Sequence, residues 1–218
     1  MELIKRAVQD NSWAAFLFIG SFILLAILKS VFQKQFNDFL GLIFTNKYIK
    51  LYSDSNLSLN WFSFFLVVIQ LISFSFFFLI ILSNLNYINK NDFSVFAGIF
   101  LILSVFVTGK YLIEKGIANL FNIQSFYNNF LFQQLSYRAY LGLALLFITF
   151  IMYYTSSAID VFSYIFLIIF VIIQLIIYLI SFKFFQKEIL GSLFYFILYL
   201  CTLEIAPYYF TYYWFTKY

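Results

Sequence analysis

Apolar runs separated by short polar segments constrain this sequence more than any other feature. A helix needs about 20 apolar residues to cross ~30 Å of hydrocarbon, and 64% of the 218 residues are hydrophobic. We therefore predict an all-α membrane protein, a bundle of about six transmembrane helices that forms a single helical membrane domain over residues 1–218. The expected spans are residues 13–28, 61–82, 93–107, 140–154, 161–182 and 192–213.

Basic residues predict the orientation of these spans. More Lys and Arg follow the first, third and fifth spans than stand in the remaining loops and termini. The positive-inside rule then places those three loops in the cytoplasm and both termini in the periplasm. Lys5 and Arg6 near the N-terminus count against this orientation.

The loops after the first and third spans carry apolar residues at helical spacing. Phe36, Phe39 and Ile43 fall on one stripe of the first loop, and Ile113, Ile117 and Leu120 do so in the second. This pattern predicts one or two amphipathic helices at the inner membrane surface, where lysines meet anionic headgroups. The alternative is that each segment extends the preceding span. The basic residues expected at the membrane surface are Lys29, Lys34, Lys110 and Lys115.

Composition removes several classes of chemistry. The chain has no histidine and one cysteine, which excludes nucleophile–histidine pairs, histidine-ligated haem and histidine-containing zinc sites. A glycine-rich phosphate loop is not found, and the net charge of +4 is spread over loops rather than gathered on one face. We expect no enzyme activity, no cofactor, no metal and no nucleic-acid partner.

The last expected span holds a carboxylate, Glu204, inside an apolar run. An ionisable group in a membrane is a functional or pairing hypothesis by default. Cys201, Glu204 and Tyr208 recur at helical spacing, and Pro207 removes a backbone donor and kinks the helix beside the acid.

Two amides on other spans are expected at a similar depth. Gln70 and Gln174 lie ~12–14 Å from the cytoplasmic ends of their spans, and Glu204 lies ~18 Å from its own. The favoured interpretation is a neutral Glu204 hydrogen-bonded to an amide as structural support. The alternative is a proton or substrate site. The functional candidates are Glu204, Pro207, Cys201, Tyr208, Gln70 and Gln174.

The run from Cys201 to Pro207, with Thr202 and Glu204 inside it, resembles an uncharacterised family of Bacteroidota integral membrane proteins, domain of unknown function 4271. The resemblance implies a helical bundle in the inner membrane of a bacterium with two membranes. It implies no activity.

Two functions are expected. The first is a non-enzymatic inner-membrane subunit or scaffold of a larger envelope or protein-export assembly, with lipids and other membrane proteins as partners. The alternative is a small transporter or proton-coupled channel that uses Glu204.

Overall fold

The structure is a computed structural model, and it describes residues 12–43, 47–52, 61–85, 87–120, 124–155 and 159–184. Every regular element in these ranges is a helix, as the sequence predicts. The elements are α1 (Ser12–Val31), α2 (Gln33–Leu40), the 3-10 turn η1 (Gly41–Ile43), α3 (Lys47–Tyr52), α4 (Trp61–Asn84), α5 (Phe93–Leu120), α6 (Gln124–Tyr154) and α7 (Ile159–Phe184).

Four of these helices are long and apolar enough to cross a membrane. They are α1, α4, α5 and residues 128–154 of α6, and they contain the first four predicted spans. Helix α7 covers the fifth predicted span, and the apolar stretch described within it is Ile165–Ile177. The sixth predicted span, residues 192–213, lies outside the described residues.

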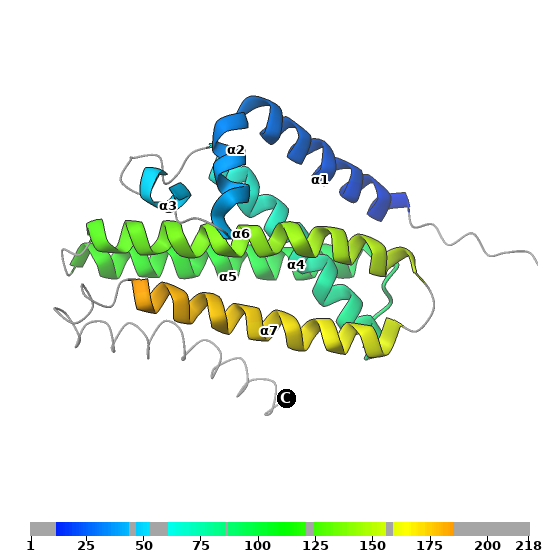
Figure 1. Ribbon diagram of the computed structural model, residues 1–218. Helices are drawn as coiled ribbons and strands as arrows, with labels where there is room; N and C mark the ends of the chain where they lie inside the picture. Colours follow the sequence, from blue (N-terminus) through cyan, green and yellow to red (C-terminus); the bar gives the residue numbers. More distant parts are fainter. Residues whose placement is uncertain are drawn as a thin grey trace, which may run out of the picture.

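The long helices alternate in direction (Figure 1). Helices α1, α5 and α7 run one way along the bundle, and α4 and α6 run the other way. Consequently α2, α3, the end of α5 and the start of α6 gather at one end, while the end of α4, the start of α5, the end of α6 and the start of α7 lie at the other. This is the alternation that the predicted spans require.

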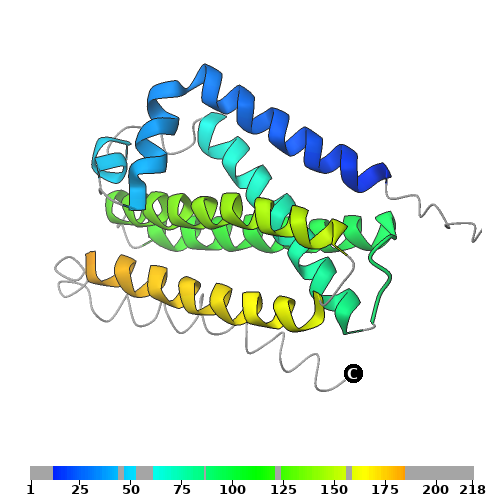
Figure 2. The same cartoon turned by 45° about the vertical axis from the view of Figure 1, so that its right-hand side comes forward.

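Helix α4 forms the centre of the bundle. It contacts α1, α5, α6 and α7. In its apolar stretch 61% is buried within the protein, compared with 44% in α6, 22% in α1 and 6% in α5. Two views place α1 and α7 on opposite sides of the group formed by α4, α5 and α6 (Figure 2).

A glycine allows a close approach of α4 and α6. A Cβ atom at Gly142 would lie 2.8 Å from the Cα of Gln70 and 2.9 Å from its Cβ, so the two backbones meet there. Small residues permit this approach in membranes, where packing rather than the hydrophobic effect holds helices together. The nearby hydroxyls bond within their own helices: Ser73 donates to the carbonyl of Ile69 at 2.8 Å.

Aromatic side chains connect α1 to the end of the bundle at which α4 ends and α5 begins. The rings of Phe18 and Phe76 stack with centroids 4.2 Å apart. The Trp13 indole N–H donates to the Asn91 carbonyl at 2.9 Å, and the Tyr153 hydroxyl donates to the Lys90 carbonyl at 3.3 Å. These two hydrogen bonds hold Lys90 and Asn91, which lie between α4 and α5, against α6 and α1 respectively.

The two expected amphipathic segments behave differently. Helix α2 begins after a break at Phe32, and its Phe39 is fully buried against Tyr48, Phe62 and Tyr140. Its aromatic side therefore contacts protein rather than lipid.

In the second segment the alternative is observed. Helix α5 continues without a break for 28 residues, about 42 Å at 1.5 Å per residue, which exceeds the ~30 Å hydrocarbon layer. Helix α6 begins at Gln124 and is 31 residues long. The predicted loop is therefore largely a helical hairpin that extends past the apolar layer.

We predict that Gly142→Ala destabilises the fold, because the added methyl meets the backbone of Gln70 rather than a movable side-chain end. Overpacking of this kind costs about 1–3 kcal/mol. The matched control is Gly98→Ala on α5, where a Cβ meets nothing within 4 Å. Thermal unfolding of both variants in one detergent measures the difference. An equal midpoint for the two alanine variants would contradict the close approach of α4 and α6.

Candidate functional site

The residues predicted as functional candidates divide into two groups. Glu204, Pro207, Cys201 and Tyr208 lie outside the described residues. Gln70 and Gln174 are described, on α4 and α7 respectively.

Gln70 is buried at the crossing of α4 and α6. Its side chain is 5% exposed, and none of the described groups donates a hydrogen bond to its Oε1 atom. A buried acceptor without a donor costs about 1–3 kcal/mol. One further hydrogen-bond donor would therefore satisfy the Oε1 atom of Gln70.

Gln70 and Gln174 stand at the same level of an antiparallel helix pair. Phe74 on α4 contacts Phe170 on α7 edge to face, with ring centroids 5.4 Å apart. Gln70 precedes Phe74 by one helical turn, and Gln174 follows Phe170 by one turn. Because the two helices are antiparallel, both amides lie one turn from the Phe74–Phe170 contact, on the same side of it. Gln174 is half-buried.

A second polar group lies at the end of the bundle that holds α2 and α3. Tyr48 of α3 is 1% exposed and forms hydrogen bonds with the side chains of Gln35 on α2 and Ser136 on α6. Its ring also stacks on Phe132, with centroids 5.5 Å apart. One side chain thus joins three helices, and we call Gln35, Tyr48 and Ser136 the Tyr48 cluster.

The protonation of Tyr48 follows from its position. Burial raises the pKa of its phenol, and this effect outweighs the two hydrogen bonds that lower it. The hydroxyl is therefore neutral over the physiological range and serves as a hydrogen-bonding group rather than a base.

Two further polar groups lie in this region: Gln133 follows Phe132 along α6, and the ring of Tyr52 lies 5.1 Å from that of Tyr48 between centroids. Gln133 of α6 is 1% exposed, and its Oε1 atom has no donor among the described groups. Tyr52 donates to an Asp38 carboxylate oxygen at 3.3 Å. The three side chains of the Tyr48 cluster are neutral, and they therefore interact with one another by hydrogen bonding.

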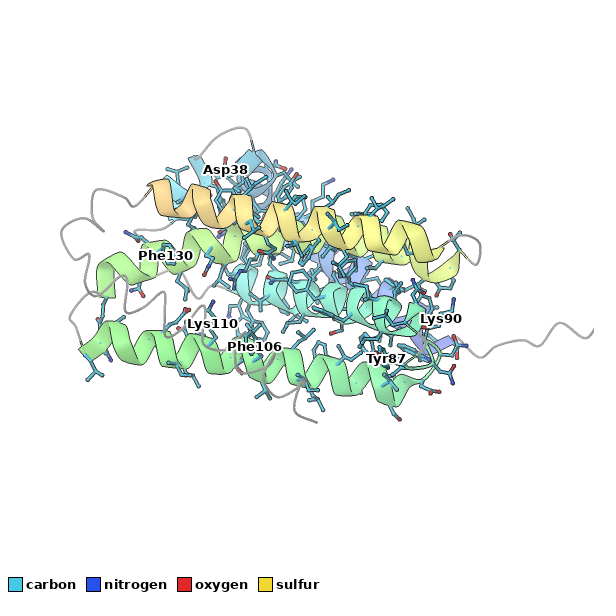
Figure 3. The ribbon with its side chains drawn as sticks, turned by 90° about the horizontal axis from the view of Figure 1, so that it is seen from below. Asp38, Tyr87, Lys90, Phe106, Lys110 and Phe130 are labelled. Atoms are coloured by element: carbon cyan, nitrogen blue, oxygen red, sulfur yellow. The ribbon has the colours of Figure 1, made fainter. Side chains whose placement is uncertain are left out.

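The basic residues predicted at the membrane surface have unequal environments. Lys29, Lys34 and Lys115 are exposed, whereas Lys110 pairs with buried Glu114 at 3.6 Å within α5. Lys115 lies over the Tyr111 ring, 5.7 Å from its centroid. Figure 3 shows Lys110 at the same end of the bundle as Phe130 on α6, with Lys90 at the opposite end.

Several residues of this region were not identified from the sequence. Gln35, Tyr48, Ser136 and Gln133 are isolated polar residues in segments where polar residues are expected at the surface, so no periodic signal marks them. Gly142 gave a weak signal, because it interrupts an apolar helix in which glycine is unfavourable.

Metal ligation is not supported in the part of the chain that the structure describes. No group of three or more His, Cys, Asp or Glu side chains comes together there.

The fold and the apolar helices define the class: a multi-pass helical membrane protein. Within that class, the chain belongs to the family described as "Domain of unknown function (DUF4271)", whose model matches residues 14–215. This match confirms the family indicated by the run around Glu204. No curated protein and no solved structure matches the chain.

We predict that Tyr48→Phe lowers the free energy of unfolding by about 1–3 kcal/mol at neutral pH, because partners of the hydroxyl lose a buried hydrogen bond. The pH dependence has a defined sign. A folded-state pKa raised by burial stabilises the fold fully below the unfolded pKa of about 10, and this contribution is lost as the pH rises through the folded value.

The measurement is the thermal unfolding midpoint of wild type and Tyr48→Phe from neutral to alkaline pH. Wild type loses more stability on alkalinisation than the variant, which lacks the titrating group. Parallel decline of the two proteins would show that Tyr48 is not held in the buried neutral state. The other tyrosines are common to both proteins, so the difference isolates Tyr48.

Proposed function

We propose that this protein is a non-enzymatic subunit or scaffold of a larger envelope or protein-export assembly. In this proposal it resides in the inner membrane of a bacterium of the Bacteroidota, with both termini in the periplasm and other membrane proteins as partners. The distribution of Lys and Arg supports the orientation.

The supporting observation is the apolar surface of α5. Only 6% of the apolar stretch of this helix is buried within the protein. Ile102 and Val105 are 70% and 69% exposed. Exposure continues toward the end of the helix at Ile113 and Leu120.

The length of α5 relative to the membrane indicates whether lipid or protein covers this surface. Because α5 is about 42 Å long and the hydrocarbon layer is ~30 Å thick, acyl chains do not cover its whole length. Large exposed apolar patches outside that layer mark protein contacts. A partner helix packed along α5 buries the residues inside the membrane and those beyond it together.

We predict that a photoreactive p-benzoylphenylalanine in place of Ile113 forms one discrete adduct with a second protein in intact membranes. The matched control replaces Ile19 on α1, because both isoleucines are 55% exposed. Ile19 lies in the middle of a span, where lipid is the expected neighbour. Electrophoresis and mass spectrometry of the adducts identify the partner. Adducts at both positions, or lipid adducts alone at Ile113, would contradict a specific partner surface on α5.

A second candidate function is a small transporter or proton-coupled channel centred on Glu204. The observation that favours it is the buried Oε1 atom of Gln70, which accepts no hydrogen bond from the described residues and lies at the same level as Gln174. A protonated carboxyl is a suitable donor for that oxygen. If the Glu204 carboxyl bound and released a proton beside Gln70 in each cycle, proton movement would be coupled to transport.

Glu204 variants separate the two functions. If the protein is a scaffold, Glu204→Gln preserves a donor and complements a strain that lacks the gene, whereas Glu204→Leu destabilises the fold by about 1–2 kcal/mol. If the protein moves protons, Glu204→Gln reaches normal abundance yet fails to complement, because an amide releases no proton. Growth and protein level are measured together. Failure of Glu204→Gln at normal abundance overturns the scaffold proposal.

A further inference from the structure

An apolar groove lies between α1 and the beginning of α4, at the surface of the bundle. Its volume is about 480 Å³. At Gly20 an added Cβ would meet nothing within 4 Å, so the groove is open beside this glycine. Its walls include Gly20, Ile23, Ile27 and Val31 of α1, and Trp61 and Phe65 of α4.

The groove has the depth of one membrane leaflet. Gly20 is close to the middle of α1, which runs from Ser12 to Val31, and the groove ends near Val31 and Trp61. Eleven residues of helix separate Gly20 from Val31, a rise of about 16 Å. Half of the ~30 Å hydrocarbon layer is about 15 Å. The groove therefore extends from the bilayer centre to the headgroup boundary of the leaflet at the α2 end.

The residues at the outer end fit this position. Trp61 is 71% exposed, and tryptophan favours the boundary between acyl chains and headgroups. Phe32 lines the groove, and the exposed Lys34 follows it by two residues, a backbone separation of at most about 7 Å. A cationic residue thus lies within two residues of the outer end of the groove, the end at which the phosphate of a lipid would lie.

We propose that this groove is a binding site for one anionic phospholipid, with an acyl chain along Gly20, Ile27 and Phe65 and the phosphate near Lys34. Apart from the indole N–H of Trp61, the side chains of the walls are apolar, which suits a hydrocarbon chain. The exposed lysine at the outer end provides charge complementarity for the headgroup. The lipid fills the space between α1 and the central helix α4.

Filling the groove tests the site of the acyl chain. Gly20→Leu adds a side chain at a position where a Cβ meets nothing within 4 Å, so we expect the fold to be retained. Its matched control is Gly98→Leu, at another glycine whose Cβ would meet nothing within 4 Å. The proteins are reconstituted in nanodiscs of equal phosphatidylglycerol and phosphatidylcholine, extracted, and analysed by native mass spectrometry.

We expect wild type and Gly98→Leu to retain phosphatidylglycerol, and Gly20→Leu to retain about tenfold less, because the acyl chain loses its apolar contacts. Thermal unfolding of each variant without added lipid confirms that the fold is unchanged. If Gly20→Leu keeps its bound lipid, the groove is not the site. A dimer or bound protein that Gly20→Leu dissociates, without loss of lipid, assigns the groove to protein and overturns the proposal.

A pair of lysines tests the headgroup. Lys34→Gln removes the charge at the outer end of the groove, and we expect it to lower the preference for phosphatidylglycerol over phosphatidylcholine about fivefold. The control is Lys29→Gln. Lys29 follows Gly20 by nine residues, which turns it to the opposite side of α1. Equal effects of the two substitutions would indicate general surface charge, and no effect of Lys34→Gln would remove the headgroup contact; either outcome rejects an anionic lipid in this groove.

Discussion

The contact between Gly142 and Gln70 is the constraint on which the arrangement of the bundle depends. Lipid tails are as apolar as leucine, so burial of apolar surface contributes little free energy to the association of helices in a membrane. Close packing must drive that association, and the absence of a Cβ at Gly142 lets the backbones of α4 and α6 come together. Helix α4 can then act as the axis that α1, α5 and α7 also contact.

Hydroxyls and amides take different roles in this core. Ser73 and Thr149 donate to carbonyls four residues earlier in their own helices, so each hydroxyl is satisfied without a partner from another helix. Gln70 and Gln133 each keep a buried carbonyl oxygen without a donor among the described groups. Each of these two amide oxygens can therefore accept one more hydrogen bond, whereas the hydroxyls of Ser73 and Thr149 are already satisfied. Tyr48 is the exception, since its hydroxyl links α3 to both α2 and α6.

Hydropathy and periodicity predicted the helical class, the positions of the first five apolar segments and the amphipathic character of α2. They could not predict what α2 contacts, because an aromatic stripe that faces lipid and one that packs on Tyr48 and Phe62 have the same sequence period. The unbroken course of α5 was also ambiguous, since its charged residues Lys110 and Glu114 suggest a loop until they are seen to pair along the helix. Gly142 illustrates a third limit: its importance depends on Gln70, a residue on another helix.

Depth in the membrane gives the exposed apolar surfaces different meanings. In the proposal above, the groove along α1 lies within one leaflet, and an acyl chain fills its volume. The apolar side of α5 extends from the span to Leu120, beyond the length that hydrocarbon covers. At that position exposed leucine and isoleucine contact water unless another protein covers them. The same residue types therefore favour lipid on α1 and a protein on α5, and the length of each helix decides between them.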